Sequence, residues 1–158
     1  MNVYVDDPYI EKETVKTSGA MPVDNISENL PKMDAVTLHC PKNNETTDLF
    51  TKQEFDLMKK SSFIINCARG GILNEEDLYE ALTNKKIAGA GLDVFDVEPT
   101  PSSNPLFKLN NVILSPHIAG VTVESTVRMA TETVQNVLDV LDDKINQSVV
   151  VNNKEIGI

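Results

Sequence analysis

Short runs of consecutive apolar residues alternate along the chain with stretches in which apolar residues recur at helical spacing. A strand that is buried on both faces reads as a continuous apolar run, so we expect strands over these runs. The run at Phe63–Ile65 is of this kind and implies helices on both sides of a sheet. The predicted strands are Asn2–Val5, Ala35–Leu38, Phe63–Ile65, Ala88–Val94 and Val112–Leu114, with a further short one at Val149–Val151.

Capping signals and helical spacing predict helices between these strands. Thr51 and Glu54 form a T-x-x-E capping box, and Asn74 has the side chain of an N-cap residue. Strands that alternate with helices indicate an α/β fold built on a doubly wound parallel sheet. The predicted helices are a short one within residues 24–30, one from Thr51 to about Lys60, one after Asn74 that buries Leu78, Ala81 and Leu82, and one from about Val123 to Leu141.

Composition narrows the class of protein. A length of 158 residues suffices for one domain, and 41% hydrophobic with 24% charged residues is typical of a folded globular chain. The net charge of −10, spread along the chain, argues against nucleic acid or an anionic membrane as a partner. Cys40 and Cys67 show neither metal-ligand spacing nor a disulfide pattern, so we expect no metal site and a reducing compartment. With no leader and no membrane-spanning apolar run, we expect a cytoplasmic protein.

Three ionisable residues, Arg69, Glu98 and His117, each follow a predicted strand. Ligands of parallel α/β sheets bind outside the carboxyl ends of the strands, so all three side chains are candidates for one crevice. A guanidinium can bind a carboxylate through two parallel hydrogen bonds. A carboxylate beside an imidazole stabilises the protonated ring and orients it, so that the pair can give a proton to a carbonyl oxygen that receives hydride. The ordinary alternatives are a surface arginine and a structural histidine.

Other polar residues at strand ends are candidates for cofactor binding. Asp7 could accept hydrogen bonds from the adenosine ribose of NAD and would repel the 2′-phosphate of NADP, although an Asp before a Pro is also a common turn-former. Asp93 ends an apolar strand, where its carboxylate needs donors; a nicotinamide carboxamide and a backbone turn are both possible. For His39 we favour a structural or cofactor-lining role.

The glycine-rich phosphate loop of dinucleotide-binding folds is missing. G-x-G-x-x-G should lie roughly 20 residues before the ribose-binding acid, which places it upstream of Met1. Gly89-Ala90-Gly91 is no substitute, because it lies inside a predicted strand and no helix follows directly. We therefore expect a chain that begins inside a dinucleotide-binding domain.

Three strings, NCARGGILNEEDLYEAL, GAGLDVFDVEP and LSPHIAG, occur in this order. In order and spacing they resemble the D-isomer-specific 2-hydroxyacid dehydrogenases, most closely the 3-phosphoglycerate dehydrogenase branch, over nearly the whole chain from Asp7. Glu98 stands where the formate dehydrogenase branch has glutamine, which favours 2-hydroxyacid chemistry.

The resemblance implies that His117 is the acid/base, Glu98 its partner and Arg69 the residue that holds the substrate's carboxylate and carbonyl oxygen. It implies NAD as the cofactor, with Asp7 at the adenosine ribose and with Cys40, Pro41, Cys67, Ala68, Arg69, Asp93, His117, Ala119 and Gly120 lining the site.

The resemblance also implies a partial Rossmann-like fold. Residues 1–143 would be part of an NAD-binding domain, and residues 144–158 a tail that returns to a substrate domain. The family's first strand lies between the strands at Asn2–Val5 and Ala35–Leu38, so we expect these two to lack the neighbour that joins them to the rest. Family dimers pair through this domain, which makes a homodimer the expectation for a full-length parent.

Two hypotheses about function follow. The first is an oxidoreductase that transfers hydride between NAD and a small D-2-hydroxy or 2-oxo acid, with little or no activity in this chain by itself. The second is a non-catalytic NAD-sensing or dimerisation module of the same fold, like the family's corepressor relatives. An intact Arg69, Glu98 and His117 argue against the second, because a binding module needs no proton-transfer pair. A truncated gene product with its upstream half encoded separately is a third possibility.

Overall fold

The computed structural model describes residues 1–152 and 155. It divides into two compact units, Met1–His117 and Ile118–Ile158, which we describe separately. Every residue of the candidate active site except Ala119 and Gly120 belongs to the first unit.

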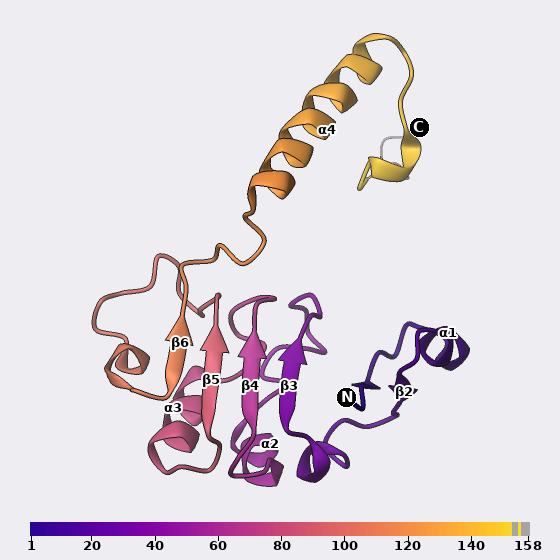
Figure 1. The fold of residues 1–158 in the computed structure, drawn as a ribbon. Helices are drawn as coiled ribbons and strands as arrows, with labels where there is room; N and C mark the ends of the chain where they lie inside the picture. The colour runs from indigo at the N-terminus through magenta and orange to yellow at the C-terminus, as the bar shows by residue number, and fades with distance from the viewer. Residues whose placement is uncertain (153–154, 156–158) are drawn as a thin grey trace. The chain divides into compact units, whose positions relative to one another are not determined.

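The first unit is built on a four-stranded parallel sheet in the order β3-β4-β5-β6 (Figure 1). The predicted strands are confirmed, with β5 shorter than expected. Because all strands run in the same direction, their carboxyl ends share one edge. The strands are β3 (Ala35–Leu38), β4 (Phe63–Asn66), β5 (Gly89–Leu92) and β6 (Val112–Leu114).

Helices α2 (Lys52–Leu57) and α3 (Glu75–Thr83) share one hydrophobic core with the side chains on one face of the sheet. Val36, Ile64 and Ala90 are in register on that face and are buried. Both predicted caps are present, at Thr51 and at Asn74. Helix α2 ends at Leu57 and not near Lys60, because Met58 turns to an extended conformation (ψ 155°) and is buried in the core. The core side chains include Val36, Leu38, Phe55, Ile64, Leu78, Leu82, Ala90 and Leu92.

The opposite face of the sheet is open within the first unit. Phe63 is 50% exposed and Ile113 is 80% exposed, and both lie on this face. The expectation of helices on both sides is therefore not met by the helices of Met1–His117. The loop after β5 leads through a 3₁₀ turn, η2 (Pro105–Lys108), back to β6.

The N-terminal segment forms a separate two-stranded parallel sheet of β1 (Tyr4–Val5) and β2 (Met21–Pro22), joined by α1 (Lys12–Thr17). Sequence pattern missed α1 and β2, because α1 buries only Val15 and β2 has two residues. The sequence predicts that both early strands lack the neighbour that joins them to the rest. This holds for β1, which pairs with β2 in a sheet of their own. It is wrong for β3, which pairs with β4 along its whole length as the edge strand of the four-stranded sheet.

The helix predicted within residues 24–30 is wrong. The segment turns instead, because side chains take its backbone donors: Asp6 Oδ2 accepts from the Ile26 N–H at 2.7 Å and Asn25 Oδ1 from the Ser27 N–H at 2.9 Å. Only a 3₁₀ turn, η1 (Leu30–Lys32), follows. Local side-chain bonds of this kind compete with helix formation.

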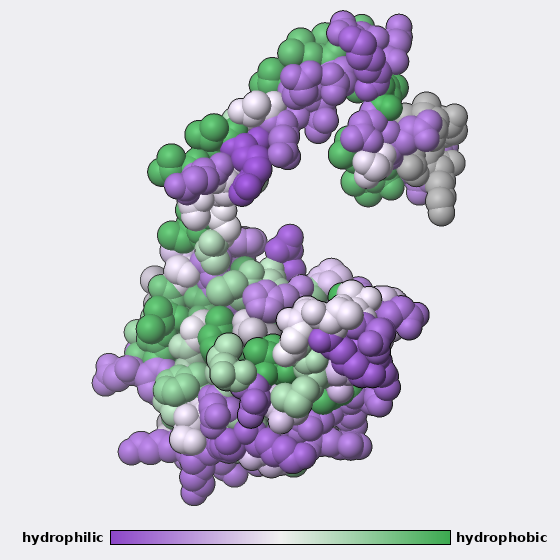
Figure 2. Space-filling view, turned by 45° about the vertical axis from the view of Figure 1, so that its right-hand side comes forward, coloured by the Kyte–Doolittle hydropathy of each residue, from purple (hydrophilic) through white to green (hydrophobic). Residues whose placement is uncertain are grey.

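The second unit contains α4 (Val123–Leu141), whose bounds match the prediction, and a 3₁₀ turn, η3 (Gln147–Val149). Figure 2 shows hydrophobic side chains gathered along one side of α4. The strand predicted at Val149–Val151 is wrong, because Val149 closes η3 and the next N–H bonds back to Gln147. Over the part of the chain that is described, no helix has both the length and the apolar content to cross a bilayer. The predicted domain boundary at residue 143 stays a prediction.

Candidate active site

Glu98 and His117 are in direct contact. Glu98 Oε2 lies 2.8 Å from His117 Nδ1, although the residues are 19 positions apart. The contact forms because Glu98 follows β5 and His117 follows β6, two strands that are neighbours in the sheet. An ionised carboxylate can only accept, so Nδ1 carries the hydrogen. Nε2 is then the ring nitrogen that can exchange a proton with a ligand.

The backbone of His117 is held in the left-handed region, with φ at +56°. Residues other than glycine seldom adopt this conformation, which costs on the order of 1–3 kcal/mol and concentrates at functional sites. The His117 N–H donates to the carbonyl oxygen of Asp93 at 2.7 Å, which fixes the turn after β6. The fold thus stabilises a strained position that sets the direction of the imidazole.

Hydrogen bonds keep Glu98 ionised. The bond to His117 is the largest cause that lowers the pKa of Glu98, and the Phe95 N–H, which donates to Oε1 at 2.9 Å, is the next. Burial and the nearby charge of Asp93 act in the opposite direction but do not reverse the shift. At neutral pH the pair therefore holds a carboxylate beside an imidazole.

The pair lies in a hollow of about 690 Å³ whose other walls are largely apolar. Phe95 and Phe107 form an edge-to-face pair there, with ring centroids 6.0 Å apart. Apolar walls with a few convergent polar groups are typical of small-molecule sites. The hollow is lined by Phe95, Glu98, Pro99, Thr100, Phe107, Leu114, Ser115, Pro116 and His117.

Arg69 lines a second hollow, of about 540 Å³, after β4. The buried side chain of Asn66 shapes this turn: its Nδ2 donates to the Arg69 carbonyl at 2.9 Å, and its Oδ1 accepts from the Ala68 N–H at 3.0 Å. The guanidinium Nη1 donates to the Ala68 carbonyl at 2.6 Å. The structure therefore brings Glu98 and His117 together, and places Arg69 at the same edge of the sheet but in a different hollow.

Half of the predicted cofactor-lining residues share this second hollow. It is lined by His39, Cys40, Pro41, Lys42, Cys67, Ala68 and Arg69. Burial is the main cause that raises the pKa of the Cys40 thiol, which favours its neutral form in the wall of the hollow. His39 Nε2 lies 2.9 Å from Thr37 Oγ1, in keeping with either role expected for it. Lys42 was not predicted, since one lysine after a proline carries no distinctive signal.

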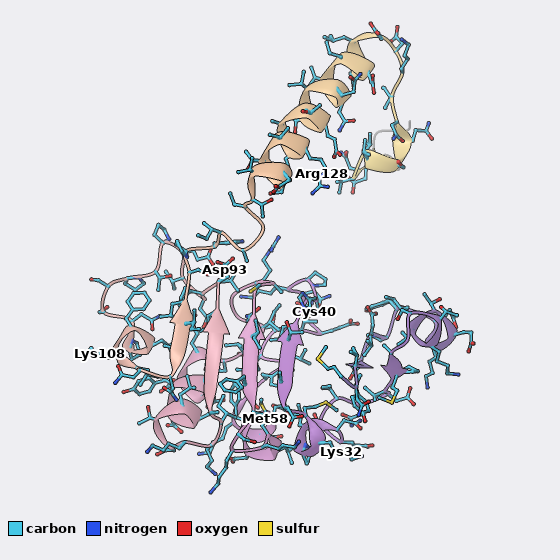
Figure 3. All side chains as sticks on the ribbon, viewed as in Figure 1. Lys32, Cys40, Met58, Asp93, Lys108 and Arg128 are labelled. Atoms are coloured by element: carbon cyan, nitrogen blue, oxygen red, sulfur yellow. The ribbon has the colours of Figure 1, made fainter. Side chains whose placement is uncertain are left out.

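Asp93 is 2% exposed, and its Oδ1 accepts a hydrogen bond from Ser115 Oγ at 2.5 Å. The hydroxyl of the residue that follows β6 is thus one donor for this buried carboxylate, a partner that the sequence did not suggest. Figure 3 shows Cys40 and Asp93 at the edge of the sheet to which the arrowheads of β3 and β5 point.

The remaining predicted residues are less closely tied to these hollows. Asp7 is exposed, and its Oδ1 accepts from the Tyr9 N–H at 2.9 Å, as in the turn-forming alternative, while its second oxygen has no hydrogen bond within the described residues. Ala119 and Gly120 belong to the second unit, so their cofactor role stays a prediction. Among described residues, no group of three or more His, Cys, Asp or Glu side chains is arranged to hold a metal ion.

Comparison with known proteins adds a family assignment. The sequence model described as "D-isomer specific 2-hydroxyacid dehydrogenase, NAD binding domain" matches residues 1–119. D-3-phosphoglycerate dehydrogenase of Methanocaldococcus jannaschii is 41% identical over 150 residues, which cover 95% of this chain and 28% of that protein. Glyoxylate reductase of Thermofilum pendens is 42% identical over 127 residues, 80% of this chain and 37% of that protein.

Solved structures agree with these relatives. The NAD-complexed form of a D-isomer specific 2-hydroxyacid dehydrogenase from Lactobacillus delbrueckii ssp. bulgaricus matches with a TM-score of 0.85 and 28% identity, over 94% of this chain and 48% of that one. The chain thus spans less than half of the length of each of these three proteins.

Proposed function

The chain belongs to the D-isomer-specific 2-hydroxyacid dehydrogenase family, and from this premise we propose that it supplies the NAD-binding part and the proton-transfer pair of an NAD-dependent oxidoreductase. The reaction is hydride transfer between NAD and a small D-2-hydroxy acid, which becomes a 2-oxo acid. The observation that carries the proposal is the 2.8 Å contact between Glu98 Oε2 and His117 Nδ1 at the carboxyl ends of neighbouring strands.

The residues have distinct roles in this proposal. In oxidation, His117 Nε2 takes the proton of the substrate hydroxyl, and in reduction it returns a proton to the carbonyl oxygen. Glu98 holds Nδ1–H and stabilises the charged ring while the proton is on His117. Arg69 binds the substrate's carboxylate and carbonyl oxygen through its planar fork, for which its guanidinium must leave the Ala68 carbonyl or share it.

The second hollow fits a nicotinamide cofactor. Its walls combine the neutral, partly apolar surfaces of Cys40, Pro41, Cys67 and Ala68 with the cation of Lys42, and it opens where ligands of parallel sheets bind. NAD, when bound, supplies or accepts the hydride. Asp7 is assigned to the adenosine ribose.

For the substrate we propose 3-phosphoglycerate. The support is the identity of 41% with the archaeal D-3-phosphoglycerate dehydrogenase, while a glyoxylate reductase at 42% marks the competing substrate class. A cytoplasmic location and a homodimer formed by a full-length parent belong to the same proposal.

Two assays test the function. The chain itself, mixed with NADH and hydroxypyruvate or glyoxylate, should show little or no turnover, because its sequence has no G-x-G-x-x-G phosphate site; clear turnover would overturn that expectation. A chimaera in which this chain replaces the matched segment of the M. jannaschii relative should reduce NAD with 3-phosphoglycerate.

His117→Ala in that chimaera separates an enzyme from a sensing module. We expect turnover to fall by about 10²–10⁴ while NAD binding, measured by calorimetry, stays within about twofold. A chimaera that folds and binds NAD but oxidises no 2-hydroxy acid would refute the enzymatic proposal and favour the sensing module.

A further inference from the structure

Glu75, the first residue of α3, has no part in the chemistry proposed above, yet both of its carboxylate oxygens are occupied. Oε1 accepts a hydrogen bond from the Asp96 N–H at 2.6 Å, and Oε2 accepts one from Asn104 Nδ2 at 3.0 Å. Asp96 and Asn104 lie on either side of Glu98 in the loop after β5. One side chain of α3 thus bonds the loop both before and after Glu98.

The two bonds act close to the proton-transfer pair. The Phe95 N–H donates to Glu98 Oε1 at 2.9 Å, and the next N–H along the chain, that of Asp96, donates to Glu75. Two consecutive amides are therefore held by two different carboxylates. Hydrogen bonds to a charged acceptor are roughly twice as strong as neutral ones, so the amides are fixed firmly.

The same loop is joined to the turn that carries Arg69. The Gly71 N–H donates to the Asp96 carboxylate, with Lys42 beside both. Burial, followed by the charge of Glu75, raises the pKa of Asp96, while Lys42 and the Gly71 N–H act in the opposite direction. Asp96 therefore connects the turn after β4 to the loop after β5 through its bond with Gly71. Its own N–H bonds Glu75 and so connects the same loop to α3.

We propose that Glu75 is a positioning residue that holds Glu98 in contact with His117. The catalytic importance of this role rests on the proposed function, whereas the contacts of Glu75 do not depend on it. Without Glu75 the Asp96 amide and the Asn104 side chain lose their acceptors. The loop then moves more freely, and the carboxylate of Glu98 is no longer aimed at Nδ1.

The neighbouring residue provides a matched control. Glu76 lies in the same first turn of α3 and is exposed, and its side chain has no hydrogen bond or ion pair within the described part of the chain. Glu75→Ala and Glu76→Ala therefore remove the same charge from the same helix start, and only the first removes the two bonds to the loop.

The test uses the whole chain and two NMR measurements that do not depend on turnover. The first is amide hydrogen exchange of Phe95, with amides inside β4 and β5 as the reference for global stability. The second is the ¹⁵N signature of the His117 ring, which reports whether Nδ1 carries the hydrogen; His39, the other of 2 histidines, is the internal reference.

We expect Glu75→Ala to speed exchange at Phe95 by about tenfold, the factor that one lost charged hydrogen bond implies, and to shift His117 away from the Nδ1–H form. Glu76→Ala should change neither. Unchanged signals in Glu75→Ala, an equal change in Glu76→Ala, or equal acceleration of the β4 and β5 amides would each overturn the proposal.

A second variant covers the case in which Glu75→Ala does not fold. Glu75→Gln retains an acceptor for the Asp96 N–H but loses the charge that both donors share, so we expect a smaller acceleration at Phe95, of about threefold. Exchange at the wild-type rate in this variant would contradict the proposal. Because turnover is measured in neither experiment, a failure here is distinct from a failure of the dehydrogenase assignment.

Discussion

Replacing Gly70 by alanine tests how closely the Arg69 turn packs against the loop that carries Glu98. An added Cβ would lie 1.8 Å from the Phe95 carbonyl oxygen, 2.2 Å from its carbon and 2.7 Å from the Asp96 nitrogen. Cβ atoms essentially never approach other atoms closer than 3.0 Å, so the carbonyl must retreat by about 1.2 Å. All three obstructing atoms are backbone, which prevents relief by a simple change of rotamer.

Overpacking of this kind costs about 1–3 kcal/mol, and the backbone obstruction places Gly70→Ala at the upper end. With a urea slope of about 2 kcal/mol per molar, a cost of about 3 kcal/mol lowers the unfolding midpoint by about 1.5 M. The assay is equilibrium urea unfolding of the chain, followed by far-ultraviolet circular dichroism.

Gly91→Ala is the control for this experiment. A Cβ at Gly91 would lie 3.8 Å from Ile65 Cγ1, an ordinary contact, so the urea midpoint should stay the same or rise slightly. Equal midpoints for Gly70→Ala and Gly91→Ala would refute the close packing of the two loops. They would also weaken the inference that the turn carrying Arg69 and the loop carrying Glu98 hold each other in place.

Two further predictions concern a cap and a titrating group. Thr51→Ala removes the side chain that caps α2 and bonds Glu54, and should lower the free energy of unfolding by about 1 kcal/mol in urea titrations; a loss below about 0.2 kcal/mol would show that the cap is dispensable. Glu98 has a folded-state pKa below its ordinary value of 4.5, so its contribution to stability is present above that value and is lost as the pH falls through the lowered one. The urea midpoint of Glu98→Gln should therefore lie below that of the wild type at about pH 6, and the difference should shrink as the pH falls below 4.5 through the lowered pKa, whereas a constant difference would contradict the link to ionisation.

The sheet of the first unit could be predicted because its strands are apolar runs that a parallel sheet buries. Ile64 and Leu92 are buried as the pattern requires. The N-terminal elements could not, since α1 buries one residue and β2 is two residues long. Val149–Val151 has strong strand propensity, but a strand needs a neighbouring ladder, and its backbone donors bond within a turn.

The candidate site was predicted to a similar extent. Glu98 and His117 meet because they follow adjacent strands, which the order of strands and helices already implied. Arg69 follows the next strand over, but its guanidinium is bonded to the Ala68 carbonyl, a local choice that spacing does not reveal. The role of Glu75 was hidden for another reason: an acid in the first turn of a helix is already explained by the helix dipole.

The most direct test of the account is a double-mutant cycle on the proton-transfer pair, measured as kcat for NAD-dependent oxidation of 3-phosphoglycerate by the chimaera with the M. jannaschii relative. If Glu98 acts through His117, His117→Ala lowers kcat by about 10²–10⁴, Glu98→Gln lowers it by a smaller factor, and the double variant is no slower than His117→Ala alone. A double variant slowed by the product of the two single effects, or a His117→Ala variant that turns over at the unaltered rate, would contradict the claim that the two residues work as one unit.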